Sequence, residues 1–182
     1  MVGQVNNFNL LVSSSRYNEV NSKAELWFTL LMCGDEYPII SDLEFMGLIT
    51  AMTSLNAKDV IAKIKDILIK DPNFFNYILK IIPIDFVCQT DVNVINQIIA
   101  QHYDQYIDKE DTFRIVLKRR KGVNEIIERN SFIKIVARNI ENQVNLENPD
   151  KIIRFDILGN FTAISFLRNV DILRIPNKYN PD

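Results

Sequence analysis

The sequence predicts an α+β protein built of two units. Segments that alternate apolar and polar residues, as strands do, are interleaved with segments whose apolar residues recur at helical spacing. The chain has 182 residues, of which 47% are hydrophobic, and this is enough to bury a core in one large or two small domains. Because the sequence contains no internal repeat and no Gly/Ser-rich linker, we expect two closely packed units, residues 1–89 and 90–182.

The first unit is predicted to follow the order β-α-β-β-α-β. Its clearest element is the second helix, in which Val60, Ile64 and Ile67 lie at helical spacing after a capping Asn56. This order is that of the ferredoxin-like plan, an antiparallel sheet with two helices on one face. In chain order, the predicted elements are a strand at 7–15, a helix at 21–35, strands at 37–45 and 47–53, a helix at 56–71, and one apolar strand at 77–89.

The second unit is also predicted to mix helices and strands. Its first helix follows a capping Asp91, and its second helix is expected to begin after a capping Ser131. The predicted elements are a helix at 91–107, a strand at 112–120, a helix at 131–143, strands at 151–159 and 161–167, and, as a further candidate, a strand at 170–175.

The strand at 112–120 ends in four consecutive cations, in the run "DTFRIVLKRRKG". Alternation places Phe113, Ile115 and Leu117 on its buried face. From Thr112 to Arg138 there are eight cations and two anions, although the whole chain has a net charge of -2. Such an excess is expected of a protein that binds a phosphate backbone, but an ordinary solvated basic face gives the same pattern. The candidate RNA-binding residues are Arg114, Lys118, Arg119, Arg120, Lys121, Arg129, Lys134 and Arg138.

The sequence offers few of the groups on which catalysis depends. Its single histidine, His102, excludes a multi-histidine metal site, and we expect it to be a half-exposed helix residue and not part of a triad. Cys33 and Cys88 are far apart in the sequence and form no CxxC pair, so we expect two buried free thiols. The five glycines do not fall in the spacing of a phosphate-binding loop. We therefore expect no catalytic residue, no metal site, no cofactor and no enzymatic activity.

The sequence also lacks the features of membrane and secreted proteins. It contains no run of about 18 apolar residues, and its first residues do not form the basic and apolar regions of a secretory signal. We therefore expect a cytoplasmic protein with no membrane partner.

The second unit resembles a known RNA-binding module. The run that begins "DTFRIVLKRRKG" and continues through "NSFIKIVARNIENQVNLENPDKIIRFDILGNFTAISFL" is similar to the THUMP domain of tRNA-modifying proteins. The opening "NFNLLVSS" and the later "GLITAMT" are similar to segments of the small archaeal THUMP proteins that assist tRNA cytidine acetyltransferase. The resemblance implies a ferredoxin-like domain at residues 1–89, packed against a THUMP domain at residues 90–182.

This resemblance implies a non-catalytic adaptor that presents tRNA to a separate modifying enzyme. THUMP domains of the family recognise the acceptor end of tRNA, and the implied partner is tRNA cytidine acetyltransferase, which forms N4-acetylcytidine. We expect no catalytic domain to follow "DILRI", as an adaptor role requires. Two alternatives stay open: a self-sufficient RNA-modifying enzyme, and a ferredoxin-like regulatory protein that binds a metabolite or another protein.

Overall fold

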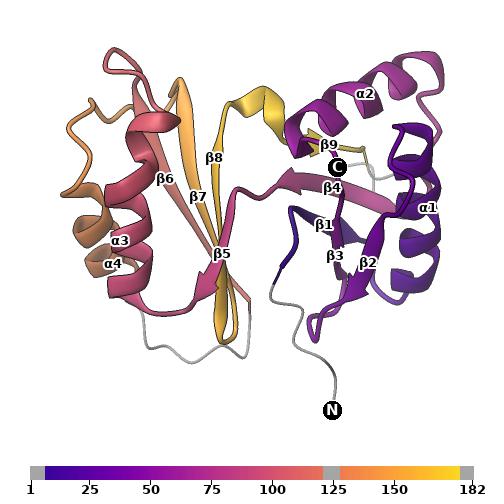
Figure 1. Ribbon diagram of the computed structural model, residues 1–182, viewed down its shortest axis with the longest axis horizontal. Helices are drawn as coiled ribbons and strands as arrows, with labels where there is room; N and C mark the ends of the chain where they lie inside the picture. The colour runs from indigo at the N-terminus through magenta and orange to yellow at the C-terminus, as the bar shows by residue number, and fades with distance from the viewer. Residues whose placement is uncertain (1–6, 121–127, 177–182) are drawn as a thin grey trace. The chain divides into compact units, whose positions relative to one another are not determined.

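The computed structural model describes residues 7–120 and 128–176 (Figure 1). The predicted α+β fold class is confirmed, since these residues form four α-helices and two sheets of five and four strands. The contacts between residues divide the chain into two compact units. The first unit combines the chain up to Ile84 with the chain from Val170 onward, and the second unit is Asp85–Asn169. None of the helices in the described ranges is long and apolar enough to cross a membrane.

The first unit has the predicted β-α-β-β-α-β order. All of its strand pairs are antiparallel, with β3 between β1 and β2, and with β1 between β3 and β4. This strand order is consistent with the predicted ferredoxin-like architecture. The elements are β1 (Leu10–Ser14), α1 (Glu19–Met32), β2 (Ile39–Asp42), β3 (Leu48–Met52), α2 (Ala57–Lys70) and β4 (Ile78–Pro83).

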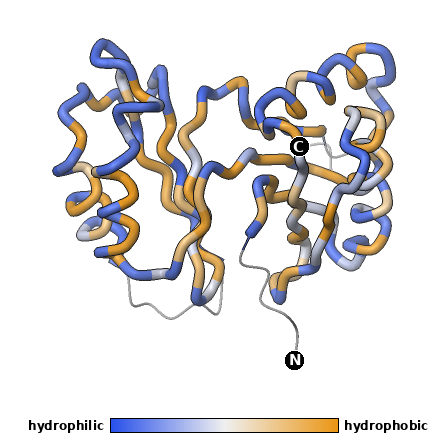
Figure 2. The backbone as a smooth tube through the Cα atoms, in the orientation of Figure 1, coloured by the Kyte–Doolittle hydropathy of each residue, from blue (hydrophilic) through white to orange (hydrophobic). Residues whose placement is uncertain are grey.

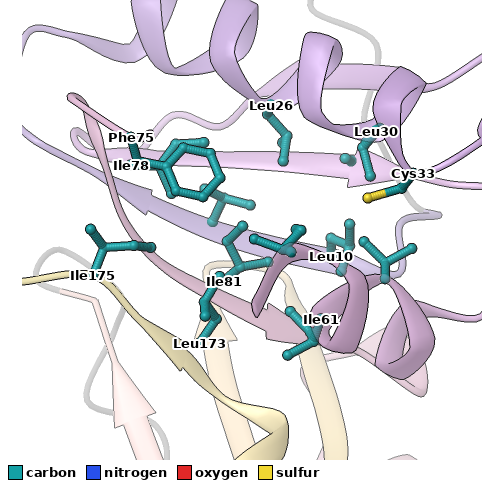
Figure 3. Close-up of a cluster of buried hydrophobic side chains, with 14 of the residues drawn as sticks. Leu10, Leu26, Leu30, Cys33, Ile61, Phe75, Ile78, Ile81, Leu173 and Ile175 are labelled. Atoms are coloured by element: carbon teal, nitrogen blue, oxygen red, sulfur yellow. The ribbon is translucent and has the colours of Figure 1, made fainter. Parts of the chain in front are cut away.

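The core of the first unit lies between its sheet and its two helices. Figure 3 shows Leu26 and Leu30 of α1 over strand residues such as Leu10 and Ile81, all of them buried. The predicted cap of α2 is confirmed, because the Asn56 side chain accepts the backbone N–H groups of Lys58 and Asp59. α1 instead begins at Glu19, two residues before the predicted start at residue 21, and its cap residue, Asn18, makes no side-chain capping hydrogen bond.

The apolar stretch at 77–89 is not one strand, as predicted, but two. It divides into β4 and β5 (Phe86–Gln89), and β5 pairs with β8 of the second sheet. The change falls between two adjacent residues, since the Ile84 N–H donates to the Asn9 carbonyl whereas the Asp85 N–H donates to the Ile164 carbonyl. Pro83, which has no N–H to donate, ends β4.

The segment at 170–175 does not extend the second sheet, so that expectation is wrong. Its strand, β9 (Leu173–Arg174), pairs antiparallel with β4 of the first sheet. Leu173 and Ile175 are buried in the core of the first unit, whereas Arg174 between them is exposed. The burial of two apolar side chains thus returns the end of the described chain to the first unit.

The second unit places two helices on one face of a four-stranded sheet (Figure 1). β6 and β7 are parallel, while β8 is antiparallel to both β7 and β5. Hydrophobic residues run along β7 and β8 (Figure 2), and almost every residue of these two strands is buried. The remaining elements are α3 (Val92–His102), β6 (Phe113–Arg119), α4 (Arg129–Ala137), β7 (Lys151–Leu158), β8 (Phe161–Leu167) and 3-10 turns at Tyr103–Gln105 and Asn169–Asp171.

We expect Leu173→Ala to lower the free energy of unfolding by about 2 kcal/mol, because it leaves a cavity in the core of the first unit. Arg174→Ala is the matched control, since this neighbouring side chain is exposed and its removal should change stability by no more than about 0.5 kcal/mol. Urea unfolding followed by circular dichroism measures both. Equal stability of the two variants would show that β9 does not contribute to this core.

Candidate nucleic-acid interface

Lys118 and Arg119 lie at the end of β6, a strand whose position is fixed by the burial of its apolar side chains. β6 is the last strand in the order β5-β8-β7-β6, and Phe113 and Leu117 lie in the core beneath the helices. Burial of each such side chain contributes about 1.5 to 3 kcal/mol. Lys118 and Arg119, directly after Leu117, are exposed, and the Arg120 N–H still donates to the Ile157 carbonyl at 3.4 Å. The cations therefore extend from a backbone that the sheet holds in place.

Several elements end at the same edge of the sheet as these cations. Because β6 and β7 are parallel, the end of β6 lies at the edge where β7 turns into β8, at Gly159 and Asn160. β5 also ends there, since it is antiparallel to β8 and the Thr90 N–H donates to the Asn160 carbonyl at 2.9 Å. α3 begins two residues later, so its first turn lies at this edge as well.

α4 carries the predicted cations Arg129 and Lys134, and Arg138 follows its last residue. A helix that connects two parallel strands must return the chain across the sheet, so α4 begins toward the end of β6 and finishes toward its start. Arg129 is its first residue, whereas Arg138 follows its last, and nine helical residues span about 13 Å. The structure therefore brings Arg129 toward the end of β6 and places Arg138 toward the opposite end.

The eight predicted RNA-binding residues thus separate into groups. We call Lys118, Arg119, Arg120 and Arg129 the basic edge, because they share one end of the second unit. Arg114 and Arg138 lie toward the other end, with Lys134 between. Lys121 lies outside the described residues. The exposed members are Lys118, Arg119, Arg129, Lys134 and Arg138, and the half-buried members are Arg114 and Arg120.

Arg114 has a role within the protein that the sequence did not indicate. Its Nη1 donates to the carbonyl of Leu146 at 3.2 Å, and its Nε is buried without a hydrogen-bond partner among the described atoms. The guanidinium thus holds the segment that follows α4 against β6. We infer that Arg114 contributes to the structure at the start of β6, opposite the basic edge, more than to a surface charge.

The "VNLENPD" segment, which carried part of the resemblance, forms an ordered turn beside the start of β6. Phe113 donates its N–H to the Gln143 carbonyl at 3.0 Å and accepts the Asn145 N–H at 2.9 Å. Asp150 accepts both the backbone N–H and the hydroxyl of Thr112, at 2.8 and 2.7 Å, and these bonds lower the pKa of Asp150. Asn and Asp are typical turn residues, so this turn was detectable from the sequence.

The cap of α4 differs from the prediction. The helix begins after Glu128, whose carboxylate accepts the N–H groups of Asn130 and Ser131, at 2.9 and 2.7 Å. The predicted cap, Ser131, instead donates its hydroxyl to Glu128 at 2.7 Å. The Ser131 hydroxyl, with these two backbone N–H groups, lowers the pKa of Glu128 to about 2. The sequence pattern favoured Ser131 because serine is a far more usual cap than glutamate.

Carboxylates thus occupy the starts of both helices of the second unit. Asp91 caps α3, as predicted, by accepting the N–H groups of Asn93 and Val94 at 2.7 and 3.2 Å. A free helix N-terminus can bind a phosphate through its N–H groups, but here those groups already have anionic partners. A phosphate at the basic edge would therefore be held by arginine and lysine side chains.

A buried ion pair, which the sequence analysis missed, lies beside Lys118. Arg154 donates to both carboxylate oxygens of Asp156, from Nε at 2.6 Å and from Nη2 at 2.8 Å. Lys118 is the register partner of Asp156 and so lies on the same face of the sheet. Arg154 neutralises Asp156 by a bidentate bond, so Asp156 does not require Lys118 as its counter-ion. The Lys118 side chain is exposed. The sequence did contain a signal for this ion pair, because two opposite charges stand two residues apart in the otherwise apolar run "IIRFDIL".

We expect Glu128→Gln to destabilise the chain at neutral pH but not in strong acid. The pKa of Glu128 is lower in the folded chain than its ordinary value of 4.5, so its contribution is complete above that value and is lost as pH falls toward about 2. Thermal unfolding at pH 7, 4 and 2.5 measures the difference, with exposed Glu141→Gln as the control. A difference between parent and Glu128→Gln that is the same at all three pH values would contradict this role.

Comparison with known proteins supports the identification of the second unit. Residues 89–167 match the THUMP domain family model, whereas no curated protein sequence matches the chain significantly. The chain is similar in structure to PH1313 from Pyrococcus horikoshii Ot3, with a TM-score of 0.64 and 16% identity over 89% of this chain and 55% of that one.

Two further structures share the fold at low sequence identity. A 4-thiouridine synthetase solved with RNA and ATP has a TM-score of 0.56 and 12% identity, over 92% of this chain and 42% of that one. TrmN from Thermus thermophilus has a TM-score of 0.55 and 10% identity, over 88% of this chain and 46% of that one. The chain thus spans about half the length of these proteins. Residues 89–167 thus match the THUMP family model, and the part of the chain before them has a strand order consistent with the ferredoxin-like plan.

Proposed function

We propose that this chain binds tRNA through its THUMP domain, with the basic edge as the phosphate-binding surface. The observation that carries the proposal is the position of this edge within the THUMP domain, on the end of a strand that burial holds in place. The 4-thiouridine synthetase with a similar fold was solved in a complex with RNA, which supports RNA as the ligand class.

The chemistry of the basic edge suits a phosphate backbone. Each arginine presents a planar fork that can hold two phosphate oxygens, while Lys118 acts as a point charge. Double-stranded RNA is recognised mainly by shape, 2′-hydroxyl and phosphate contacts, so cations at fixed spacing suffice without base-specific side chains. The net charge of -2 gives little long-range attraction to a polyanion, and we therefore expect dissociation constants of about micromolar for the chain alone.

We further propose that the chain is an adaptor and not itself an enzyme. Burial raises the pKa of the Cys33 thiol, and it raises that of Cys88 to about 11, which disfavours the thiolate that a nucleophile requires. The single histidine, His102, stacks on Phe86 with ring centroids 4.8 Å apart. These features support a role in which another subunit supplies the chemistry.

The proposed catalytic partner is a tRNA cytidine acetyltransferase, which would form N4-acetylcytidine. The support is the resemblance of "NFNLLVSS" and "GLITAMT" to the small THUMP proteins that assist this enzyme. A partner with its own basic groove would bind the same tRNA, so the second contact would form at high effective concentration and avidity would rise. Weak binding by the adaptor alone is compatible with this role.

Replacing Lys118, Arg119 and Arg120 together by alanine is expected to weaken tRNA binding and to reduce its salt dependence. Each phosphate contact that is lost should lower the slope of log K against log salt by about one unit. Fluorescence anisotropy titrations of labelled total tRNA at increasing KCl concentration measure both effects.

The matched control removes three exposed cations from the first unit, by Arg16→Ala, Lys70→Ala and Arg174→Ala. It changes the net charge equally, so a general electrostatic effect would weaken both triple variants to the same extent. If the triple variant of Lys118, Arg119 and Arg120 binds tRNA with unchanged affinity, these cations form only a solvated face. Parent binding that is insensitive to salt would instead favour a regulatory protein.

Acetylation of tRNA is expected only when the chain and the acetyltransferase are combined. The experiment incubates tRNA, acetyl-CoA and ATP with the chain alone, with a cytidine acetyltransferase of the same cell alone, and with both. Mass spectrometry of the digested tRNA measures N4-acetylcytidine. Equal acetylation with and without the chain would exclude the adaptor role, and acetylcytidine made by the chain alone would identify an enzyme.

A further inference from the structure

Helix α1 is apolar on both of its faces. Its inner face buries Leu26 and Leu30 in the core of the first unit. Its outer face exposes 75% of Val20, 50% of Trp27 and 55% of Phe28. A surface helix of a globular protein normally carries polar residues on its outer face, and a helix that is apolar all round is normally buried. The outer face of α1 is therefore a surface that another element is expected to cover.

The spacing of the outer residues indicates that the covering element is a helix. Val20, Ala24, Trp27 and Leu31 follow one another at intervals of four, three and four residues, which is the spacing of a coiled-coil seam. Ala24 and Trp27 are exposed, and Leu31 is half-buried. We call these four residues the α1 seam. A seam of this kind packs against a second helix that lies nearly along it.

The charged residues around the α1 seam are already paired within the first unit. Lys23 forms an ion pair with Asp42 at 2.6 Å. Glu25 accepts three backbone N–H groups of residues 76–78, at 2.7 to 3.2 Å, and Glu19 accepts the Gly47 N–H at 2.6 Å. The seam therefore requires no oppositely charged partner, and a neutral apolar surface is compatible with a copy of itself.

We propose that two copies of this chain pack their α1 helices antiparallel, about a two-fold axis between Ala24 and Trp27. In such a symmetric interface each residue meets its counterpart reciprocally, so Trp27 of each copy covers Ala24 of the other. The smallest residue of the seam thus faces the largest, as close packing requires, and Val20 faces Leu31. This pairing of small with large residues identifies a second copy as the partner.

The exposed area indicates a weak dimer. Half of an aromatic side chain is about 100 Å², so Trp27 and Phe28 contribute about 200 Å² per copy. Val20 and Met32, which are 75% and 51% exposed, add an amount of the same order, giving a total near 800 Å² for two copies, below the standard interface of about 1,600 Å². The interface is therefore small, and we expect a transient dimer that forms only at high concentration. This proposal does not depend on RNA binding.

The test uses Trp27, the only tryptophan of the chain, as an internal probe. Sedimentation velocity from about 1 to 200 µM should show a monomer–dimer equilibrium, and Trp27 emission should shift to shorter wavelength over the same range. Ala24→Glu should weaken the dimer by about 100-fold, because it buries an unpaired carboxylate. Ala62→Glu makes the same change at an exposed position of α2 and should leave the dimer unchanged. Circular dichroism checks that both variants are folded.

Cross-linking tests the antiparallel geometry. Interhelical distances are about 8 to 10 Å, so a mixture of Val20→Cys and Leu31→Cys chains should be joined by a short bismaleimide. Val20→Cys alone should not be joined, because an antiparallel pair separates its two copies by about 16 Å along the helix, whereas a parallel pair would join them. A chain that stays monomeric throughout the concentration range overturns the proposal. So does a dimer that Ala24→Glu leaves intact, or a Trp27 emission that is blue-shifted at every concentration, which would mean that the seam is covered within one molecule.

Discussion

The parallel pairing of β6 with β7 determines where the charges of the second unit lie. It directs the ends of both strands to one edge, and it requires α4 to return the chain between them. Burial of Phe113 and Leu117 then holds the register of β6, so that Lys118 and Arg119 emerge at that edge and not along the strand. A cluster that is continuous in the sequence is divided in this way between the two ends of the sheet.

The same edge shows how the fold controls its own charges. Asp91 and Glu128 satisfy the first N–H groups of α3 and α4, and Arg154 neutralises Asp156 beside the exposed Lys118. These anions have partners within the protein, and Lys118 and Arg129 of the basic edge are exposed. This asymmetry gives the basic edge a local positive character in a chain whose net charge is negative, and it leaves long side chains, not backbone N–H groups, as the available phosphate donors.

Local sequence patterns predicted most of the helices and strands. The strand pairings that were not predicted depend on residues far apart in the sequence. The helical spacing of Val60 and Ile64 and the alternation along β6 each correspond to an observed element. The division of 77–89 into β4 and β5 was not predictable, because it depends on which carbonyl accepts the Asp85 N–H, that of residue 164. β9 is only two residues long, and its position depends on burial of Leu173 in a core formed by residues far away in the sequence.

The two surfaces differ in chemistry in a way that separates their ligands. Residues 1–84, which include the α1 seam, carry seven cations and nine anions, so this part of the chain gives little attraction to a polyanion. The basic edge has the opposite character and would repel a second copy of itself. The two proposed contacts therefore require ligands of different character, one apolar and one anionic. If both contacts form, each dimer carries two basic edges, and the avidity for a polyanion rises only where one RNA molecule reaches both of them.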